Sequence, residues 1–187
     1  TYDSGLTAAK TVMAEHPEVR ILTVDTLSAT LGQGLLVDHA VELRDEGKSI
    51  DEVAQWVEMN KLHVAHWFTV DDLNFLKRGG RITASAAWFG TALKIKPVLH
   101  VDNAGKLIAM EKKIGRKKAL ARIAEIVKET GPKPAENTIW ISHGDCLEEV
   151  EEIMGMITAE TGATKFVVTT LGQVIGSHSG PGTVAVF

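Results

Sequence analysis

The spacing of apolar residues in the first third of the chain predicts three helices and one strand. Apolar positions recur every three or four residues over 6–15, 31–46 and 49–61, which is the period of an amphipathic helix. Ser49 opens the third of these segments and is a favourable helix N-cap. Residues 19–25 form a short apolar run that predicts a buried strand. Helices and a strand joined by short loops are typical of a parallel α/β sheet.

After residue 62 the pattern changes, so we divide the chain into a first domain over 1–62 and a second over 63–187. Residues 95–114 predict a β-hairpin, because two apolar runs flank a polar, glycine-containing turn at 102–105. The other strands expected are 63–70, 138–142, 165–170 and 184–187. The helices expected are a short one capped by Asp71 and ending at Gly79–Gly80, one capped by Thr83, one over 116–130 and one over 147–161.

One strand cannot make a sheet, so we expect the first domain to be the remainder of a larger parallel α/β domain. The chain also opens with Thr1 rather than Met and runs straight into a helical pattern. Both observations indicate that the native N-terminus and the first half of this domain are missing.

Composition narrows the classes of function. The 187 residues are 44% hydrophobic and 24% charged, as in an ordinary globular protein, and the net charge of −4 does not favour broad nucleic-acid binding. The single cysteine excludes an intrachain disulfide and a zinc site built from several cysteines. No apolar run approaches the ~20 residues of a membrane span, and we expect a cytoplasmic protein.

Two segments that lie far apart in the sequence carry residues suited to an anionic ligand. Arg78 and Arg81 flank a Gly-Gly pair, and guanidinium groups match carboxylate and phosphate oxygens. Near the C-terminus, residues 176–183 read as a Gly-rich loop. The donors of this loop are Ser177, His178, Ser179 and Thr183. Helix-dipole stabilisation by the arginines and a surface-turn role for the histidine are the alternative explanations.

Arg116 lies on the apolar stripe of its helix and at the helix N-terminus, where a cation is disfavoured. It therefore requires an anion, either a ligand or partner group or one of the 24 Asp and Glu residues.

Cys146 follows His143 at the start of a predicted helix and could be an activated thiolate, although sequence neighbours rarely form a nucleophile–base pair. No P-loop and no dinucleotide-binding glycine motif is found, so we expect no cofactor and no metal.

The apolar stretch Trp88, Phe89, Leu93, Ile95, Val98 and Leu99 follows the arginines directly. A plain hydrophobic core explains it, but an apolar wall beside an anion clamp would also suit an amphipathic acid.

The chain resembles the DegV family of bacterial fatty-acid-binding proteins in five segments that span its length. The segments are Val24–Gly34, Phe68–Ile82, Lys94–Leu99, Gly115–Ala119 and Ile175–Thr183. The resemblance implies a parallel α/β first domain and an α+β second domain with a mostly antiparallel sheet. It also implies that a long-chain fatty acid lies between the domains.

Proteins of this family act as carriers that present the bound acid to a fatty-acid kinase, which forms an acyl phosphate. The resemblance implies a binding subunit rather than an enzyme. It implies that Arg81 or Arg78, together with His178, binds the ligand, and that Arg116 serves phosphotransfer or partner contact. Ser177, Ser179 and Thr183 are further ligand-binding candidates because they are donors of the same loop. Family residues that bind the carboxylate would precede residue 1. A stand-alone hydrolase using Cys146 or His143, and a ligand-free interaction module, remain as alternatives.

Overall fold

The computed structural model describes residues 1–82 and 94–187, which divide into two compact units. Unit 1 comprises residues 1–29 and 33–64, and unit 2 comprises residues 30–32 and 65–187. The helix predicted from Thr83 onwards, with Trp88, Phe89 and Leu93, falls outside the described residues.

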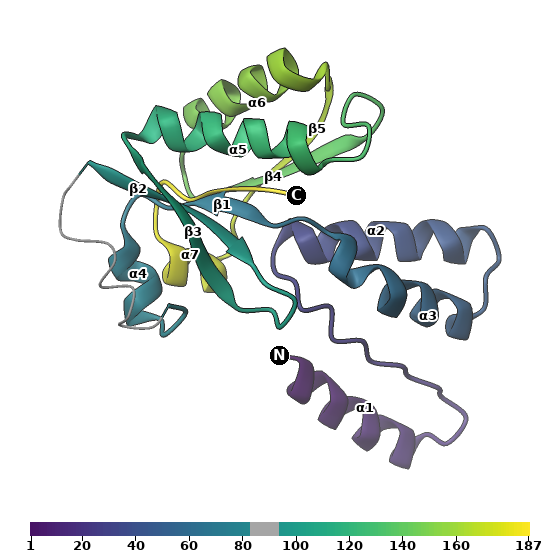
Figure 1. Cartoon of the computed structure of the whole chain (residues 1–187). Helices are drawn as coiled ribbons and strands as arrows, with labels where there is room; N and C mark the ends of the chain where they lie inside the picture. The colour runs from purple at the N-terminus through teal and green to yellow at the C-terminus, as the bar shows by residue number, and fades with distance from the viewer. Residues whose placement is uncertain (83–93) are drawn as a thin grey trace. The chain divides into compact units, whose positions relative to one another are not determined.

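Unit 1 contains the three helices that the apolar period predicts. They are α1 (Tyr2–Glu15), α2 (Leu31–Asp45) and α3 (Ile50–Asn60), and a 3₁₀ turn, η1 (Lys61–His63), follows (Figure 1). Ser49 caps α3 as expected: its hydroxyl accepts the backbone N–H of Glu52, and the Glu52 carboxylate accepts the backbone N–H of Ser49. This reciprocal pair satisfies two amide donors that would otherwise be free at the helix start.

The strand predicted over 19–25 is wrong. These residues are extended, but they pair with no strand, and every other regular element within residues 1–64 is a helix or a 3₁₀ turn. The extended segment is tied down by a side chain instead, because the Arg20 guanidinium donates to the Asp51 carboxylate in the first turn of α3, with 2.7 Å from Nη1 to Oδ2. An apolar run alone therefore did not distinguish a strand from an unpaired extended segment.

Unit 2 is built on a six-stranded sheet with the order β3-β2-β1-β6-β4-β5. The β4–β5 pair is parallel and all other pairs are antiparallel, which confirms the mostly antiparallel sheet. The strands are β1 (Trp67–Thr69), β2 (Ile95–Val101), β3 (Leu107–Ile114), β4 (Thr138–His143), β5 (Lys165–Thr170) and β6 (Val184–Val186).

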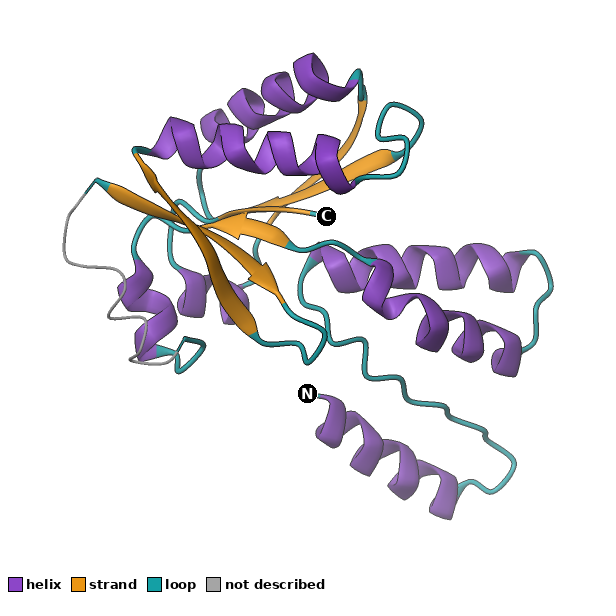
Figure 2. Cartoon of the chain, viewed as in Figure 1, coloured by secondary structure: helices purple, strands orange, loops and turns teal. Residues whose placement is uncertain are grey.

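Within the described residues of unit 2, helices cover both faces of this sheet (Figure 2). On one face lie α5 (Arg116–Thr130) and α6 (Leu147–Thr161), and on the other lie α4 (Leu73–Arg78) and α7 (Gln173–Ser179). None of the helices within residues 1–82 and 94–187 is both long and apolar enough to cross a bilayer.

Alternation along the strands sends side chains into a separate core on each face. Val184 and Val186 of β6 pack with Ile123 of α5 and Ile153 of α6, while Ala185 between them joins the core that contains Leu76 of α4. The strand periodicity thus fixes which helices each residue of β6 meets.

The carboxyl ends of β1, β3, β4 and β5 lie at the same end of the sheet. Thr69 at the end of β1 pairs with Val184 at the start of β6, and His143 at the end of β4 pairs with both Val184 and Thr170. The helices α4, α5, α6 and α7 follow these four strands in the chain, so all four begin at this one end. We call it the convergent end.

We predict that Ile123→Ala destabilises the fold by about 2–5 kcal/mol, because it opens a cavity in a fully buried site. Ile114→Ala is the matched control, since Ile114 is 70% exposed and its truncation should change the free energy of unfolding by less than ~0.5 kcal/mol. Urea unfolding measures both. Equal costs for the two variants would contradict the assignment of the core.

Candidate functional site

The structure brings His178 against the backbone of Gly79, which lies between Arg78 and Arg81. A Cβ placed on Gly79 would overlap the His178 ring, so the imidazole fills the space that a side chain at residue 79 would need. The cause is topological: α4 follows β1, α7 leads into β6, and β1 and β6 pair antiparallel. The two segments that the sequence identified as anion-binding candidates therefore meet at the convergent end.

A second glycine contact holds α4 and α7 together. Gly180 ends α7 with a φ of +80°, a backbone conformation that favours glycine, and a Cβ there would collide with the Phe75 ring of α4. The two helices can approach this closely because Gly79 on one and Gly180 on the other lack side chains.

Arg78 and Arg81 are both exposed. The Arg78 guanidinium lies 4.7 Å from the centroid of the Phe75 ring, which orients it by a cation–π contact. Arg81 donates from Nη1 to the Gly79 carbonyl oxygen at 2.9 Å. In the described part of the chain neither arginine forms an ion pair with a carboxylate, so their charge is not neutralised internally.

The prediction of a loop over residues 176–183 is wrong in its first half, because Gly176 to Ser179 form the C-terminal turns of α7. The serine hydroxyls of this helix donate to carbonyl oxygens of its preceding turn. Ser177 donates to the Val174 carbonyl at 2.9 Å and Ser179 to the Ile175 carbonyl at 3.0 Å. Such bonds from serine to the preceding turn are compatible with a helix.

The Thr183 hydroxyl lies within hydrogen-bonding distance of the carbonyl oxygens of Ser179 and Gly180, at 3.1 and 2.8 Å. A hydroxyl has a single O–H, so Thr183 can donate to only one of these two carbonyl oxygens at a time. In this conformation the hydroxyls of Ser177, Ser179 and Thr183 are all engaged as donors inside the protein. Their expected role as ligand donors stays a prediction. Arg78 and Arg81, by contrast, are exposed, and their role as ligand donors stays a prediction as well.

The Arg116 side chain is mostly buried and makes four hydrogen bonds within the protein. Its Nε and Nη2 donate to Oε2 of Glu149, at 2.8 and 2.5 Å, and Nη1 donates to the Thr69 hydroxyl at 3.3 Å. Nη2 also donates to the carbonyl oxygen of Gly182. Of the two anions that the sequence allowed, the internal carboxylate is confirmed: Glu149 lies in the first turn of α6, where the helix dipole favours a negative charge.

Cys146 and His143 do not form a nucleophile–base pair. The backbone N–H of Cys146 donates to Nδ1 of His143 at 3.2 Å, and the thiol donates to the Thr183 carbonyl at 3.4 Å. Burial raises the pKa of the Cys146 thiol, and the nearby Glu149 charge raises that pKa further, while Arg116 opposes them. The thiolate fraction near neutral pH is therefore lower than that of an exposed cysteine.

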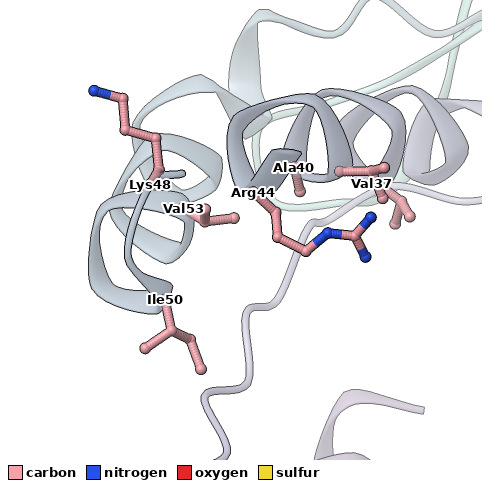
Figure 3. A pocket seen from close by; sticks show the side chains of 7 residues that line it. Val37, Ala40, Arg44, Lys48, Ile50 and Val53 are labelled. Atoms are coloured by element: carbon pink, nitrogen blue, oxygen red, sulfur yellow. The ribbon is translucent and has the colours of Figure 1, made fainter. Parts of the chain in front are cut away.

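Unit 1 carries an apolar hollow of its own between α2 and α3 (Figure 3). Its lining consists of Val37, Ala40, Val41, Arg44, Lys48, Ile50 and Val53. None of the predicted site residues lines it.

Comparison with known proteins places the chain in a single family. The DegV family model matches residues 1–187. A DegV domain-containing protein of Clostridium perfringens, CPE0026, is 46% identical over 187 residues, which cover all of this chain and 64% of the relative. The chain thus spans less than two thirds of the length of that relative.

Solved structures agree with this assignment. The fatty acid binding DegV family protein SAG1342 of Streptococcus agalactiae is 33% identical with a TM-score of 0.83, over 96% of this chain and 63% of that protein. The Fatty Acid Kinase (Fak) B3 protein of Streptococcus pneumoniae, solved with linoleic acid, has a TM-score of 0.89 over 99% of this chain and 65% of its own. Its sequence identity is 19%, so it shows likeness of fold.

We predict that Gly79→Ala destabilises the fold by roughly 1–3 kcal/mol, because the new methyl group overlaps the His178 ring. The φ of −74° at Gly79 suits alanine, so the cost comes from this contact, and His178→Ala should remove it in the double variant. Urea unfolding of the four proteins in the cycle measures the coupling. Gly176→Ala, whose Cβ meets no atom within 4 Å, is the control. The same cost with and without the imidazole would refute the contact.

We also predict slow alkylation of Cys146 by iodoacetamide near neutral pH. Because the pKa of the thiol is raised, the thiolate fraction at a given pH is lower than in an exposed cysteine, and the rate should rise only at higher pH. Unfolding in urea removes the burial and should accelerate the reaction at fixed pH. Rapid alkylation of the folded protein at pH 7 would instead reveal an activated thiolate.

Proposed function

The chain belongs to the DegV family, and we propose that it binds a long-chain fatty acid and presents the carboxylate to a fatty-acid kinase for acyl-phosphate formation. The observation that carries the proposal is the meeting of His178 with the segment that holds Arg78 and Arg81. The description of SAG1342 as a fatty acid binding protein supports the ligand, and that of the pneumococcal Fak B3 protein supports the kinase.

The chemistry of these side chains suits both the acid and its phosphorylated product. A carboxylate accepts hydrogen bonds from an imidazole N–H and from guanidinium groups, and charge-assisted bonds of this kind are the stronger ones. In the kinase reaction, a carboxylate oxygen attacks the γ-phosphorus of ATP, and the bond from this phosphorus to the oxygen bridging to ADP breaks. The acyl phosphate carries more negative charge than the acid, so exposed arginines stabilise it further.

We assign the roles as follows. The head group is bound by Arg78, Arg81 and His178, and the turn around it is shaped by Ser177, Ser179 and Thr183. Arg116 is needed for the phosphotransfer step and not for retention of the acid. The protein is a binding subunit in this proposal, with the ATP site on the partner. It works in the cytoplasm without a cofactor of its own.

We predict that full-length protein purified from its bacterial host releases long-chain fatty acids on denaturing extraction, as measured by mass spectrometry. His178→Ala should bind palmitate more weakly by about 1.5–3 kcal/mol, or roughly 10- to 150-fold in Kd, as expected for a lost hydrogen bond to a charged group. Lys133→Ala, an exposed change in a surface turn, is the control. An empty protein, or one loaded with a sugar phosphate, would overturn the proposal.

Assays on the same purified protein distinguish this proposal from the two alternative functions, a hydrolase and a ligand-free interaction module. Hydrolysis of acyl esters that disappears in Cys146→Ala would favour a hydrolase. A protein that takes up neither palmitate nor any other ligand would favour an interaction module.

A further inference from the structure

We propose that Arg116 is a positioning residue: held by Glu149, it fixes the turn at residues 180–183 and through that turn the place of His178. The expected effect on acyl-phosphate formation rests on the proposed function, whereas the expected effect on the position of the His178 ring does not. The observations that carry it are the hydrogen bonds of a mostly buried guanidinium to three separate segments of unit 2.

The first link joins Arg116 to the turn. Nη2 donates to the Gly182 carbonyl, while the amide of Gly182 donates to the Gly144 carbonyl at 2.7 Å. Gly182 is therefore held from both sides, by a side chain of α5 and by the backbone after β4. Its φ of +74° keeps it in a conformation that few other residues adopt.

The second link joins the turn to His178. Thr183 follows Gly182, and its hydroxyl lies 3.1 and 2.8 Å from the carbonyl oxygens of Ser179 and Gly180, which end α7. His178 precedes these residues in the last turn of the same helix. A shift of the turn would therefore move the end of α7 and displace the imidazole from Gly79.

Direct binding of an anion by Arg116 is disfavoured because four of its donor positions are already engaged. A guanidinium has five N–H groups, and those of Arg116 serve Glu149, Thr69 and Gly182. Arg78 and Arg81, by contrast, are exposed and lack a carboxylate partner among the described residues. Of the three arginines assigned to the site, Arg78 and Arg81 are thus exposed and available to a ligand, whereas Arg116 holds the fold of the site.

Glu149→Ala and Arg116→Lys test the proposal. Lysine keeps the charge but cannot reproduce the fork of donors that reaches three segments at once. The readouts are the NMR chemical shift of the His178 ring and the steady-state kinetics of acyl-phosphate formation from palmitate with the kinase subunit. Glu160→Ala is the matched control, because Glu160 pairs with Lys128 between the same two helices, α5 and α6, at an exposed position.

We expect both variants, but not the control, to shift the His178 resonance. We also expect kcat to fall by roughly 10- to 100-fold, the effect of misplacing a reacting group by about 1 Å, with the KM for the kinase subunit unchanged. A raised KM with an unmoved His178 resonance would overturn the proposal in favour of direct partner contact. An unmoved resonance with normal kinetics would also overturn it.

Failure of the proposed function gives a different result. If wild-type protein forms no acyl phosphate, the kinetic comparison is lost, yet the His178 resonance still decides whether Arg116 and Glu149 position the ring. If both variants unfold, Glu149→Asp replaces them under the same criteria, because it keeps the charge but shortens the side chain, so that Arg116 has to move to keep the ion pair.

Discussion

The antiparallel pairing of β6 with β1 is the constraint on which the candidate site depends. Because these strands run in opposite directions, the helix that follows β1 and the helix that precedes β6 lie at the same end of the sheet. Residues about one hundred positions apart then meet, and glycines at 79 and 180 let them meet in direct contact. A change of register between these strands by one residue would send Ala185 to the other core and move α7 away from α4.

The charges at the convergent end are arranged by burial. Arg78 and Arg81 are placed at the end of a short helix, where the dipole favours a cation and solvent remains accessible. Arg116 begins α5, where the dipole opposes a cation, and Glu149 in the first turn of α6 supplies the compensating anion. Removing one partner of such a mostly buried pair leaves the other charge without compensation, which costs more than the pair contributes by itself.

The sequence predicted what local pattern determines. The helix periods, the N-cap at Ser49 and the hairpin over 95–114 all depend on near neighbours, and the structure confirms them. The predicted strand at 19–25 failed because a strand needs a partner, which an apolar run does not reveal. The cap of α4 is Asp72, whose side chain accepts the Asn74 amide, while Asp71 pairs instead with Lys96 on β2. Adjacent aspartates look alike until the neighbouring strand is placed.

In the candidate site, too, the sequence predicted local features but not the contacts that depend on tertiary packing. The two anion-binding candidates could be identified from residue types, but their contact depended on the strand order. For Arg116 the sequence showed that an anion was required, and only the packing of α5 beside α6 identified Glu149 as that anion. The helical turns of α7 were missed because glycine and serine are poor helix formers, and the serine hydroxyls bond locally to the preceding turn.

The way polar groups are used at the convergent end favours binding over catalysis. The Cys146 thiol donates to a backbone carbonyl and has a raised pKa, and Nδ1 of His143 accepts an amide rather than a thiol proton. The hydroxyls of Ser177, Ser179 and Thr183 donate to carbonyls of α7 and its end. Groups that could act as nucleophiles are thus engaged in holding the backbone, whereas the exposed guanidiniums keep their donors. A site with groups engaged in this way is suited to holding an anion without reacting with it, which is what the proposed carrier role requires.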